Sequence, residues 1–338
     1  MNAASKPAEP QALLYDEARL QRLTAGLALV LPRWGVAESA ALSLLTISEN
    51  ATFLVAAPDG RMVLRVYRPG YHDEGEIRSE LAWIEALRAQ NVVETPQPIR
   101  DREGRLLASF HDGEGLRHVA AFAHSAGHEP EADENLPGWF RHLGETAARL
   151  HRHTRGWRRP DGFRRKKWNF ETIVGSGAYW GDWRFALGLD APGRAVLERL
   201  HRRIEAETAA LGEDADRFGL IHGDMRAANL LVDGSCLSVI DFDDCGFSWF
   251  GFDFAAAVSF IEDAPVVPDL REAWLAGYRE VAPFSQVEER ALLMLVMLRR
   301  LQLTAWIASH AETPTALSLG DAYTAGTVAL AEAYLSKG

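Results

Sequence analysis

Cysteine is nearly missing from this chain of 338 residues, which has only Cys236 and Cys245. A disulfide-stabilised secreted fold needs a larger paired set, so we expect a reducing compartment. Long apolar runs are missing too: residues 254–261 and 291–298 are too short to cross a bilayer. The first ten residues lack the apolar core of a signal peptide. We therefore expect a cytoplasmic protein without a membrane partner.

An excess of basic residues is also missing. The chain has 36 Lys and Arg against 47 Asp and Glu, a net charge of −11. Because phosphate backbones are bound by basic surfaces, we expect no nucleic-acid partner. A hydrophobic content of 47% and a charged content of 25% are those of a globular protein. The length leaves room for two domains, each with its own core.

The most informative stretch is Leu220-Ile-His-Gly-Asp-Met-Arg-Ala-Ala-Asn229, which is followed by Ile240-Asp-Phe-Asp-Asp244. Between the two, residues 230–240 carry two short apolar runs around Asp233-Gly234. An Asp-Gly pair between apolar runs is the strongest short-range signal for a β-hairpin. The two ends of a hairpin lie side by side, so the sequence predicts that these two motifs meet.

Three oxygen-bearing side chains are predicted to converge there: Asp224 and Asn229 at the entry of the hairpin, and Asp241 at its exit. Hard oxygen ligands suit magnesium. Phosphoryl transfer from a nucleotide needs one carboxylate for the acceptor hydroxyl, and a second carboxylate and an amide for the metal. The spacing Asp-(x)4-Asn with a later Asp-Phe is that of a kinase catalytic loop and metal aspartate. Ligand type alone also allows zinc, bound by His222, Asp224, Cys236 and Cys245.

This motif pair resembles the aminoglycoside phosphotransferase/choline kinase superfamily, nearest the branch of type II homoserine kinases and the bacterial stress-response kinase. The resemblance covers roughly residues 42–306 and includes three weaker segments, at residues 64–69, 143–151 and 299–306. It implies an α+β, two-lobe protein-kinase-like fold with a small β-sheet N-lobe and a larger, mainly helical C-lobe. It also implies transfer of the γ-phosphate of ATP, with Mg2+, to a hydroxyl of a small molecule such as an amino alcohol, amino acid or sugar.

The resemblance assigns roles around the hairpin. Asn229 and Asp241 would bind the metal, and Asp224 would orient the acceptor hydroxyl and take its proton late. Arg226 is either a contact to the transferring phosphoryl group or a surface residue. Asp253 resembles a residue that braces the catalytic loop. Two further acids are either additional ligands for metal or substrate, or solvated: Asp243 and Asp244.

The resemblance also predicts the phosphate-binding part of a nucleotide site. Ser48 and Asn50 lie in a turn where a phosphate-covering loop is expected. The turn has no glycine, which makes a cradle of backbone N–H groups less assured. The alternative is a plain hairpin turn. Arg65 occupies a position that is usually Lys, with Arg68 as a competitor. A guanidinium does not replace an ammonium in every respect. Two alternatives therefore remain for Arg65: it contacts the nucleotide phosphates, or it is a solvated residue of the strand.

A helix over residues 73–89 would supply Glu80 as the ion-pair partner of Arg65. Glu76 and Glu85 are the alternatives. The backbone near Phe122, Ala123 and His124 would contact the adenine.

The predicted domains are a disordered tail at residues 1–11, an N-lobe over 12–123 with a five-stranded antiparallel sheet and a helix, and a helical C-lobe over 124–338. Strands are expected at 42–47, 51–56, 62–67, 105–110, 116–122 and 218–221, and helices at 13–31, 73–89, from 136, at 191–211, from 269, over 291–305 and at 317–335. Within the Trp-rich segment 157–183, the basic run 157–168 is either a solvated loop or a contact for an anionic partner or phosphate. Its tryptophans Trp168, Trp180 and Trp183 are either core residues or an aromatic wall for a sugar or an amine.

Two other functions remain open from the sequence. One is a Ser/Thr protein kinase of the bacterial stress-response type, which would make the acceptor a protein. The other is a non-catalytic nucleotide-binding protein, although every base and metal position is filled.

Overall fold

The computed structural model describes residues 17–47, 50–130, 135–234, 236–311 and 313–337. Residue contacts divide the chain into two units, Met1–His72 with Ile99–Ala123, and Asp73–Pro98 with His124–Gly338. The helix α2 (Glu74–Ala89), which we expected with the sheet, groups by its contacts with the second unit. The predicted boundaries at residues 11 and 123 stay predictions. The tail at 1–11 and Ser48 lie outside the described residues.

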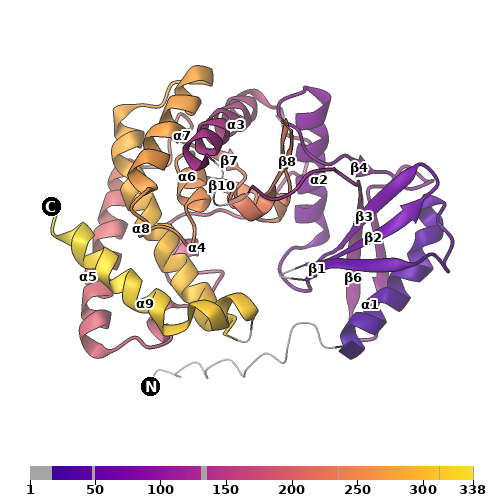
Figure 1. The fold of residues 1–338 in the computed structure, drawn as a ribbon, viewed down its shortest axis with the longest axis horizontal. Helices are drawn as coiled ribbons and strands as arrows, with labels where there is room; N and C mark the ends of the chain where they lie inside the picture. Colours follow the sequence, from indigo (N-terminus) through magenta and orange to yellow (C-terminus); the bar gives the residue numbers. More distant parts are fainter. Residues whose placement is uncertain (1–16, 48–49, 131–134, 235, 312, 338) are drawn as a thin grey trace. The chain divides into compact units, whose positions relative to one another are not determined.

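The first unit is built on one antiparallel sheet in the order β1-β2-β3-β6-β4, with β5 also paired to β6 (Figure 1). The strands are β1 (Leu42–Ile47), β2 (Ala51–Ala57), β3 (Gly60–Val66), β4 (Pro98–Ile99), β5 (Leu107–His111) and β6 (Leu116–Ala123). We predicted five strands, and the two-residue β4 is the sixth. It escaped prediction because it begins with Pro98, and proline is tolerated only at the margin of a sheet.

The helix α1 (Glu17–Val30) covers this sheet and continues into a short 3-10 helix, η1 (Leu31–Trp34) (Figure 1). The prediction of a helix over 13–31 is confirmed for the described part. Leu23 and Leu27 of α1 are fully buried and share one apolar core with Phe53 and Leu64 of the sheet. Burial of such side chains stabilises the unit by about 1.5–3 kcal/mol each.

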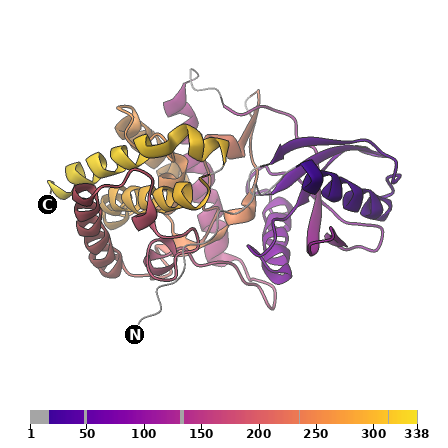
Figure 2. The ribbon, with the colours of Figure 1, turned by 90° about the horizontal axis from the view of Figure 1, so that it is seen from below.

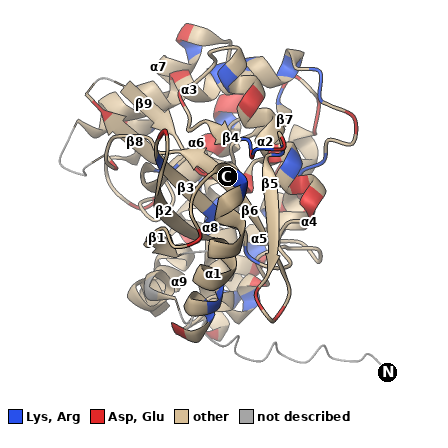
Figure 3. Ribbon diagram, turned by 90° about the vertical axis from the view of Figure 1, so that its right-hand side faces the viewer, with Lys and Arg blue, Asp and Glu red and all other residues tan. Residues whose placement is uncertain are grey.

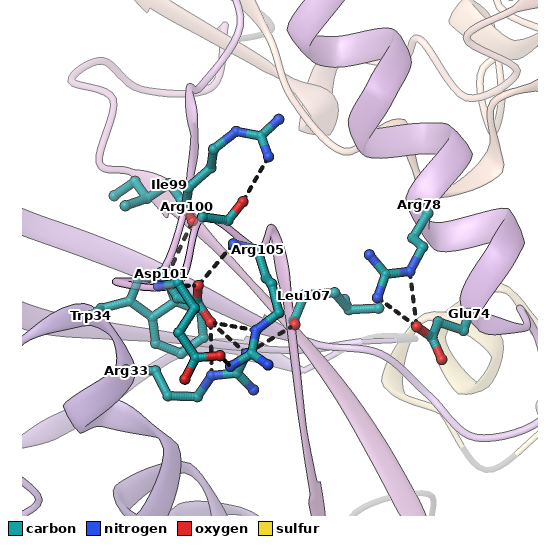
Figure 4. A network of polar contacts seen from close by, with 11 residues as sticks. Arg33, Trp34, Glu74, Arg78, Ile99, Arg100, Asp101, Arg105 and Leu107 are labelled. Carbon is teal, nitrogen blue, oxygen red and sulfur yellow. Dashed lines mark hydrogen bonds and ion pairs between the residues drawn. The ribbon is translucent and has the colours of Figure 1, made fainter. Parts of the chain in front are cut away.

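A buried acid ties η1 to the β4–β5 turn (Figure 4). Asp101 accepts hydrogen bonds from the guanidinium of Arg33 at 2.9 Å and from the backbone N–H of Arg105 at 2.8 Å. Burial alone would raise the pKa of Asp101, but these bonds lower it from 3.8 to about 2. This contribution to stability is therefore complete above the ordinary pKa and is lost as the pH falls through about 2.

The second unit is mainly helical. It contains α2, α3 (Leu136–Gly156), α4 (Phe170–Ile173), α5 (Ala191–Leu211), α6 (Phe252–Ala257), α7 (Val267–Val281), α8 (Gln286–Ser309) and α9 (Pro314–Leu335), with strands β7 (Phe218–Ile221), β8 (Leu230–Asp233), β9 (Cys236–Val239) and β10 (Gly246–Trp249). The predicted helices are confirmed, and β10, which pairs with β7, was not predicted. The C-terminal helix α9, yellow in Figure 2, packs against α5 and α8 in this unit. Acidic and basic residues are interspersed along both units (Figure 3).

The helix α8 is longer than its apolar stretch suggested. It has 24 residues and, within the described chain, is the one helix long and apolar enough to cross a membrane, but 83% of its most apolar window is buried inside the protein. A helix that is apolar on all sides and covered by its neighbours is a core helix.

Two glycines let α3 and α7 approach closely. A Cβ atom added at Gly144 would lie 1.9 Å from the carbonyl oxygen of Trp274, and one added at Gly277 would lie 1.9 Å from the carbonyl oxygen of Arg141. Since both neighbours are backbone atoms, they cannot rotate away. The helices must separate to accept any side chain at either position.

We expect Gly144→Ala to lower the free energy of unfolding by about 3 kcal/mol, the upper part of the range for overpacking. Thermal unfolding of Gly144→Ala and of the wild type measures this difference. Gly156→Ala is the matched control, because nothing lies within 4 Å of an added Cβ at that end of α3, and alanine is the better helix former. Equal melting temperatures for Gly144→Ala and the wild type would contradict the tight crossing.

Candidate active site

The catalytic loop begins where β7 ends, at His222-Gly223-Asp224. Gly223 has φ of +82°, and a Cβ atom there would lie 2.7 Å from the carbonyl oxygen of Asp244. Only glycine satisfies both conditions. The glycine therefore lets the loop pass against the segment that follows β9, which brings the two halves of the predicted site together.

Asp253, at the start of α6, braces this loop as predicted. Its Oδ1 accepts from the backbone N–H of Gly223 at 2.8 Å, and its Oδ2 accepts from that of His222 at 3.4 Å. His151 of α3 donates its Nε2 proton to Oδ2 at 2.8 Å. Burial lowers the pKa of His151, so the ring is neutral and its Nδ1 accepts from the Tyr278 hydroxyl at 3.0 Å. The brace is thus part of a buried, satisfied network.

The predicted hairpin is confirmed. Leu230 pairs with Val239 and Asp233 with Cys236, and the backbone N–H of Ile240 donates to the carbonyl of Asn229 at 2.9 Å. That last bond joins the entry of the hairpin to its exit. Asp241, the next residue, is exposed at the start of a 3-10 helix, η4 (Phe242–Asp244).

Asp224 and Asn229 are in direct contact. The side-chain amide of Asn229 donates to Asp224 Oδ2 at 2.7 Å and to the Asp224 carbonyl at 2.8 Å. Both amide hydrogens are then used on Asp224, so the amide oxygen points the opposite way. The amide oxygen of Asn229 is therefore directed away from Asp224, and its role as a metal ligand stays a prediction.

A buried arginine holds the other oxygen of Asp224. Arg299 of α8 is 2% exposed, and its Nη2 donates to Asp224 Oδ1 at 2.6 Å. Its remaining nitrogens donate to Ser259 Oγ and to Gln302 Oε1, each at 3.1 Å. Its guanidinium carbon lies 5.1 Å from the ring centroid of Trp180, within the range of a cation–π contact.

Burial would raise the pKa of Asp224, but the charge of Arg299, followed by that of Arg226, lowers it below its ordinary value. The carboxylate is therefore ionised at neutral pH. It is also a weak base, because proton affinity falls with pKa. Such a group orients a hydroxyl by hydrogen bonding well before it accepts the proton.

Sequence reasoning missed Arg299, although a signal was present. Its neighbours Leu298 and Leu301 are apolar and fully buried. An arginine inside such a helix must find a partner, since an unpaired buried charge is costly. The sequence does not reveal which carboxylate that partner is, because 75 residues separate Arg299 from Asp224.

Of the other predicted residues at the hairpin, Arg226 lies beside Asp224, with Nε 3.3 Å from Oδ2 and 36% of its side chain exposed. Its contact with a phosphoryl group stays a prediction. Asp243 is 6% exposed, so a solvated position is excluded, and its backbone N–H donates to Asp241 Oδ1 at 3.4 Å. Asp244 is half-buried.

Two of the predicted phosphate-binding residues of the first unit, Arg65 and Asn50, lie on or beside its sheet. Arg65 of β3 is 7% exposed and donates to the Tyr67 hydroxyl at 2.9 Å, so the solvated-residue alternative is wrong. Asn50 is buried and its Oδ1 accepts from the backbone N–H of Arg68 at 2.9 Å. The contacts of Arg65, Asn50 and Ser48 with a nucleotide stay predictions.

The predicted adenine-binding backbone lies at the end of β6, where Phe122 pairs with Val63 and Ala123 with Met62. His124 is the first residue of the second unit after this strand. In that unit, Glu80 of α2 is fully buried. Its pairing with Arg65 and the adenine contacts stay predictions.

The basic run 157–168 is exposed at Arg158 and Arg159, as a solvated loop would be, but two residues near its C-terminal end are buried. Arg165 is 7% exposed and Trp168 is 2% exposed. Trp183 and Trp180 are also buried, so these tryptophans belong to the core, which was one of the two alternatives.

The zinc alternative finds no support. His222 Nε2 donates to the carbonyl of Ile240 at 3.1 Å, and its Nδ1 accepts from the backbone N–H of Asp224 at 3.3 Å. Cys236 is exposed, whereas Cys245 is buried. Among the described residues, no three or more His, Cys, Asp or Glu side chains form a group that could hold a metal.

Comparison with known proteins identifies the family. Residues 45–284 match the model described as "Phosphotransferase enzyme family". A solved structure described as a microcompartment-associated aminopropanol kinase is 41% identical with a TM-score of 0.85, over 92% of this chain and 97% of that one. An uncharacterised protein of Deinococcus radiodurans is 30% identical over 85% of this chain and 82% of its own length. The predicted family and its mixed fold, a small antiparallel sheet with a larger helical part, are confirmed.

A more distant structure shares the fold. It is an amicoumacin kinase in complex with AMP-PNP, Ca2+ and Ami, 17% identical with a TM-score of 0.74 over 93% of this chain and 94% of that one. The narrower placement beside type II homoserine kinases and the stress-response kinase stays a prediction.

Proposed function

This chain belongs to the phosphotransferase enzyme family and is an enzyme, and we propose that it transfers the γ-phosphoryl group of ATP to a hydroxyl of a small molecule. The observation that carries the proposal is the arrangement of Asp224. Its carboxylate is ionised, held by Arg299 and in contact with Asn229. An acid that would orient the acceptor, beside an amide that would bind the metal, is the arrangement that a kinase catalytic loop requires.

We propose a small amino alcohol as the acceptor. The support is the sequence identity of 41%, over 92% of this chain, to a protein described as an aminopropanol kinase. An amino acid or a sugar with a free hydroxyl is the broader class. Fold alone does not determine the acceptor, so the assignment depends on the assay below.

Magnesium fits the residues present. The amide oxygen of Asn229 is directed away from Asp224, and Asp241 presents an exposed carboxylate one residue beyond the Ile240–Asn229 hydrogen bond. One amide and one carboxylate are typical of a magnesium ion that also binds phosphates and water. Bound there, the ion would neutralise charge on the phosphates of ATP.

The chain's own residues orient the acceptor and stabilise the transferring group. Asp224 would accept a hydrogen bond from the acceptor hydroxyl and receive its proton late, when the oxygen has become acidic through bonding to phosphorus. Arg226, partly exposed beside it, would neutralise charge on the transferring phosphoryl oxygens. Removal of the proton and compensation of charge are then served by adjacent residues of one loop.

Nucleotide binding would involve the first unit as well. We propose that Arg65, with Glu80 as its partner, contacts the phosphates, and that Ser48 and Asn50 cover them. The backbone at Phe122, Ala123 and His124 would contact the adenine. The net charge of −11 favours neither nucleic acid nor an anionic membrane as partner, and we propose a cytoplasmic location.

The test is an ATP-consumption assay with a panel of acceptors: 1-amino-2-propanol, ethanolamine, choline, homoserine, a hexose, spectinomycin and a casein-like protein. We expect kcat/KM for at least one amino alcohol to exceed that for the hexose by about tenfold or more, because a site built for an ammonium group rejects ligands that lack it. Asp241→Ala is the negative control. Phosphorylation of the protein substrate alone would favour the protein-kinase alternative, and nucleotide binding without any turnover would favour the non-catalytic one.

A further inference from the structure

The extended segment 164–168 packs along the chain that follows Asp241. The backbone N–H of Trp168 donates to the carbonyl of Phe247 at 2.8 Å, and the backbone N–H of Phe247 donates to the carbonyl of Lys166 at 2.9 Å. A Cβ atom added at Gly246 would lie 2.6 Å from that Lys166 carbonyl oxygen. The backbone of the segment therefore lies directly against the backbone of β10, with no room for a side chain between them at Gly246.

One guanidinium of this segment binds three backbone carbonyls. Nε of Arg165 donates to Cys245 at 2.7 Å, Nη1 donates to Glu76 of α2 at 3.0 Å, and Nη2 donates to Asp243. The side chain is buried, and all three bonds go to oxygens that carry no formal charge. A buried guanidinium has no solvent to replace these acceptors, so the carbonyls must stay where the fork of Arg165 reaches them.

The indole of Trp168 completes the set. Its Nε1 donates to the carbonyl of Asp244 at 2.8 Å, and its own carbonyl accepts from Ser248 Oγ at 2.7 Å. The carbonyls of Asp243, Asp244 and Cys245 are thus all bound by two side chains of one segment.

Asp241 has a backbone conformation that needs support from its surroundings. It has φ of +60° and ψ of +70°, a left-handed conformation that costs a residue other than glycine about 1–3 kcal/mol. Such a conformation persists only where the surrounding structure holds it. The three residues after Phe242 are held by Arg165 and Trp168, so these side chains constrain the backbone that sets the direction of the Asp241 carboxylate.

We propose that Arg165 is a positioning residue for the metal site: by binding the carbonyls of Asp243 and Cys245 and that of Glu76, it keeps Asp241 in the conformation that binds the divalent cation. The proposal rests on the proposed function, in which Asp241 is a metal ligand. Arg165 does not touch the metal or the substrate. Its effect should therefore appear in metal affinity and not in acceptor recognition.

The experiment measures Mn2+ affinity of the full chain with saturating AMP-PNP, using electron paramagnetic resonance of the free ion, for wild type and Arg165→Lys. Lysine keeps the charge and has three donors on a single nitrogen, but it lacks the planar fork that matches the positions of these three carbonyls. We expect a loss of affinity of about 10- to 100-fold, the range for residues that orient metal ligands. In turnover, the KM for metal should rise while the KM for the acceptor stays within about twofold of wild type.

Two further variants provide a control and a second, independent test. Arg164→Lys is the matched control, since Arg164 is exposed and pairs with Asp73 at 2.7 Å; we expect wild-type Mn2+ affinity. Trp168→Phe keeps the ring and removes one donor, so it should weaken Mn2+ binding in the same direction but less. If Arg165→Lys does not fold, Trp168→Phe decides.

Three results would overturn the proposal. They are wild-type Mn2+ affinity in folded Arg165→Lys, wild-type affinity in Trp168→Phe when Arg165→Lys does not fold, and wild-type affinity in Asp241→Ala, which would mean that the loop holds no metal. Failure of the proposed function is a separate outcome. It appears as a wild-type protein that binds Mn2+ with AMP-PNP but phosphorylates no acceptor in the panel.

Discussion

Asp224→Asn is expected to lower kcat by about 10²- to 10⁴-fold, the range for loss of a positioned acid–base group, while nucleotide binding changes little. Asparagine preserves the size of the side chain but carries no charge and cannot accept the acceptor's proton. In the native chain one oxygen of Asp224 accepts from the amide of Asn229 at 2.7 Å and the other accepts from Arg299. Asparagine has a single side-chain oxygen, so it can replace only one of these two acceptors. The effect should appear in kcat because the lost interaction strengthens as the hydroxyl loses its proton.

Single-turnover kinetics with ATP and a responsive amino alcohol measure this step, and calorimetry with AMP-PNP measures nucleotide binding separately. Asp233→Asn is the matched control. Asp233 is the exposed last residue of β8, where it pairs with Cys236, and the proposed mechanism gives it no role, so we expect wild-type kcat. Turnover by Asp224→Asn within about threefold of the wild type would exclude an acid–base role for this carboxylate.

The core of the site could be predicted because it depends on local geometry. A hairpin signal at Asp233-Gly234 places residue 229 beside residue 240 regardless of the rest of the fold. Helices and strands of ordinary length followed from periodicity for the same reason. The brace by Asp253 was predictable only through the resemblance, because no spacing rule links residue 253 to the backbone of Gly223.

The residues that surround this core could not be placed from the sequence. Arg299 and Arg165 reach the site from segments 75 residues or more away along the chain. Their positions depend on the packing of α8 and of the extended segment 164–168, which sequence spacing does not reveal. For Arg165 the local composition predicts the wrong environment. A run of basic residues is usually solvated, yet this arginine is buried because backbone carbonyls, which leave no trace in the sequence, serve as its partners.

Arg299→Met should have the second large effect, on the pH dependence of activity and on stability together. In the wild type, burial tends to raise the pKa of Asp224, but the charge of Arg299, followed by that of Arg226, holds it below its ordinary value. Its carboxylate is then ionised throughout the range above that value, so no acid limb from Asp224 is expected near neutral pH. Without Arg299 the effect of burial is opposed by the weaker contributions of the partly exposed Arg226 and of His222. The pKa should rise, and the acid limb of kcat/KM should move to higher pH.

Removal of one partner from a buried pair destabilises by about 3 kcal/mol, because the other charge stays in a poorly solvated place. In the folded protein the lowered pKa of Asp224 contributes stability that is present above its ordinary pKa and lost as the pH falls through the lower folded value. In Arg299→Met this contribution should disappear, so the loss of melting temperature is expected at pH 7 and should shrink towards pH 3.

Arg299→Met/Asp224→Asn should melt above Arg299→Met at pH 7, since the double variant leaves no unpaired acid. Arg290→Met, on an exposed position of the same helix, controls for loss of charge on α8. An acid limb and a melting temperature in Arg299→Met equal to those of Arg290→Met would show that Arg299 does not set the charge state of Asp224.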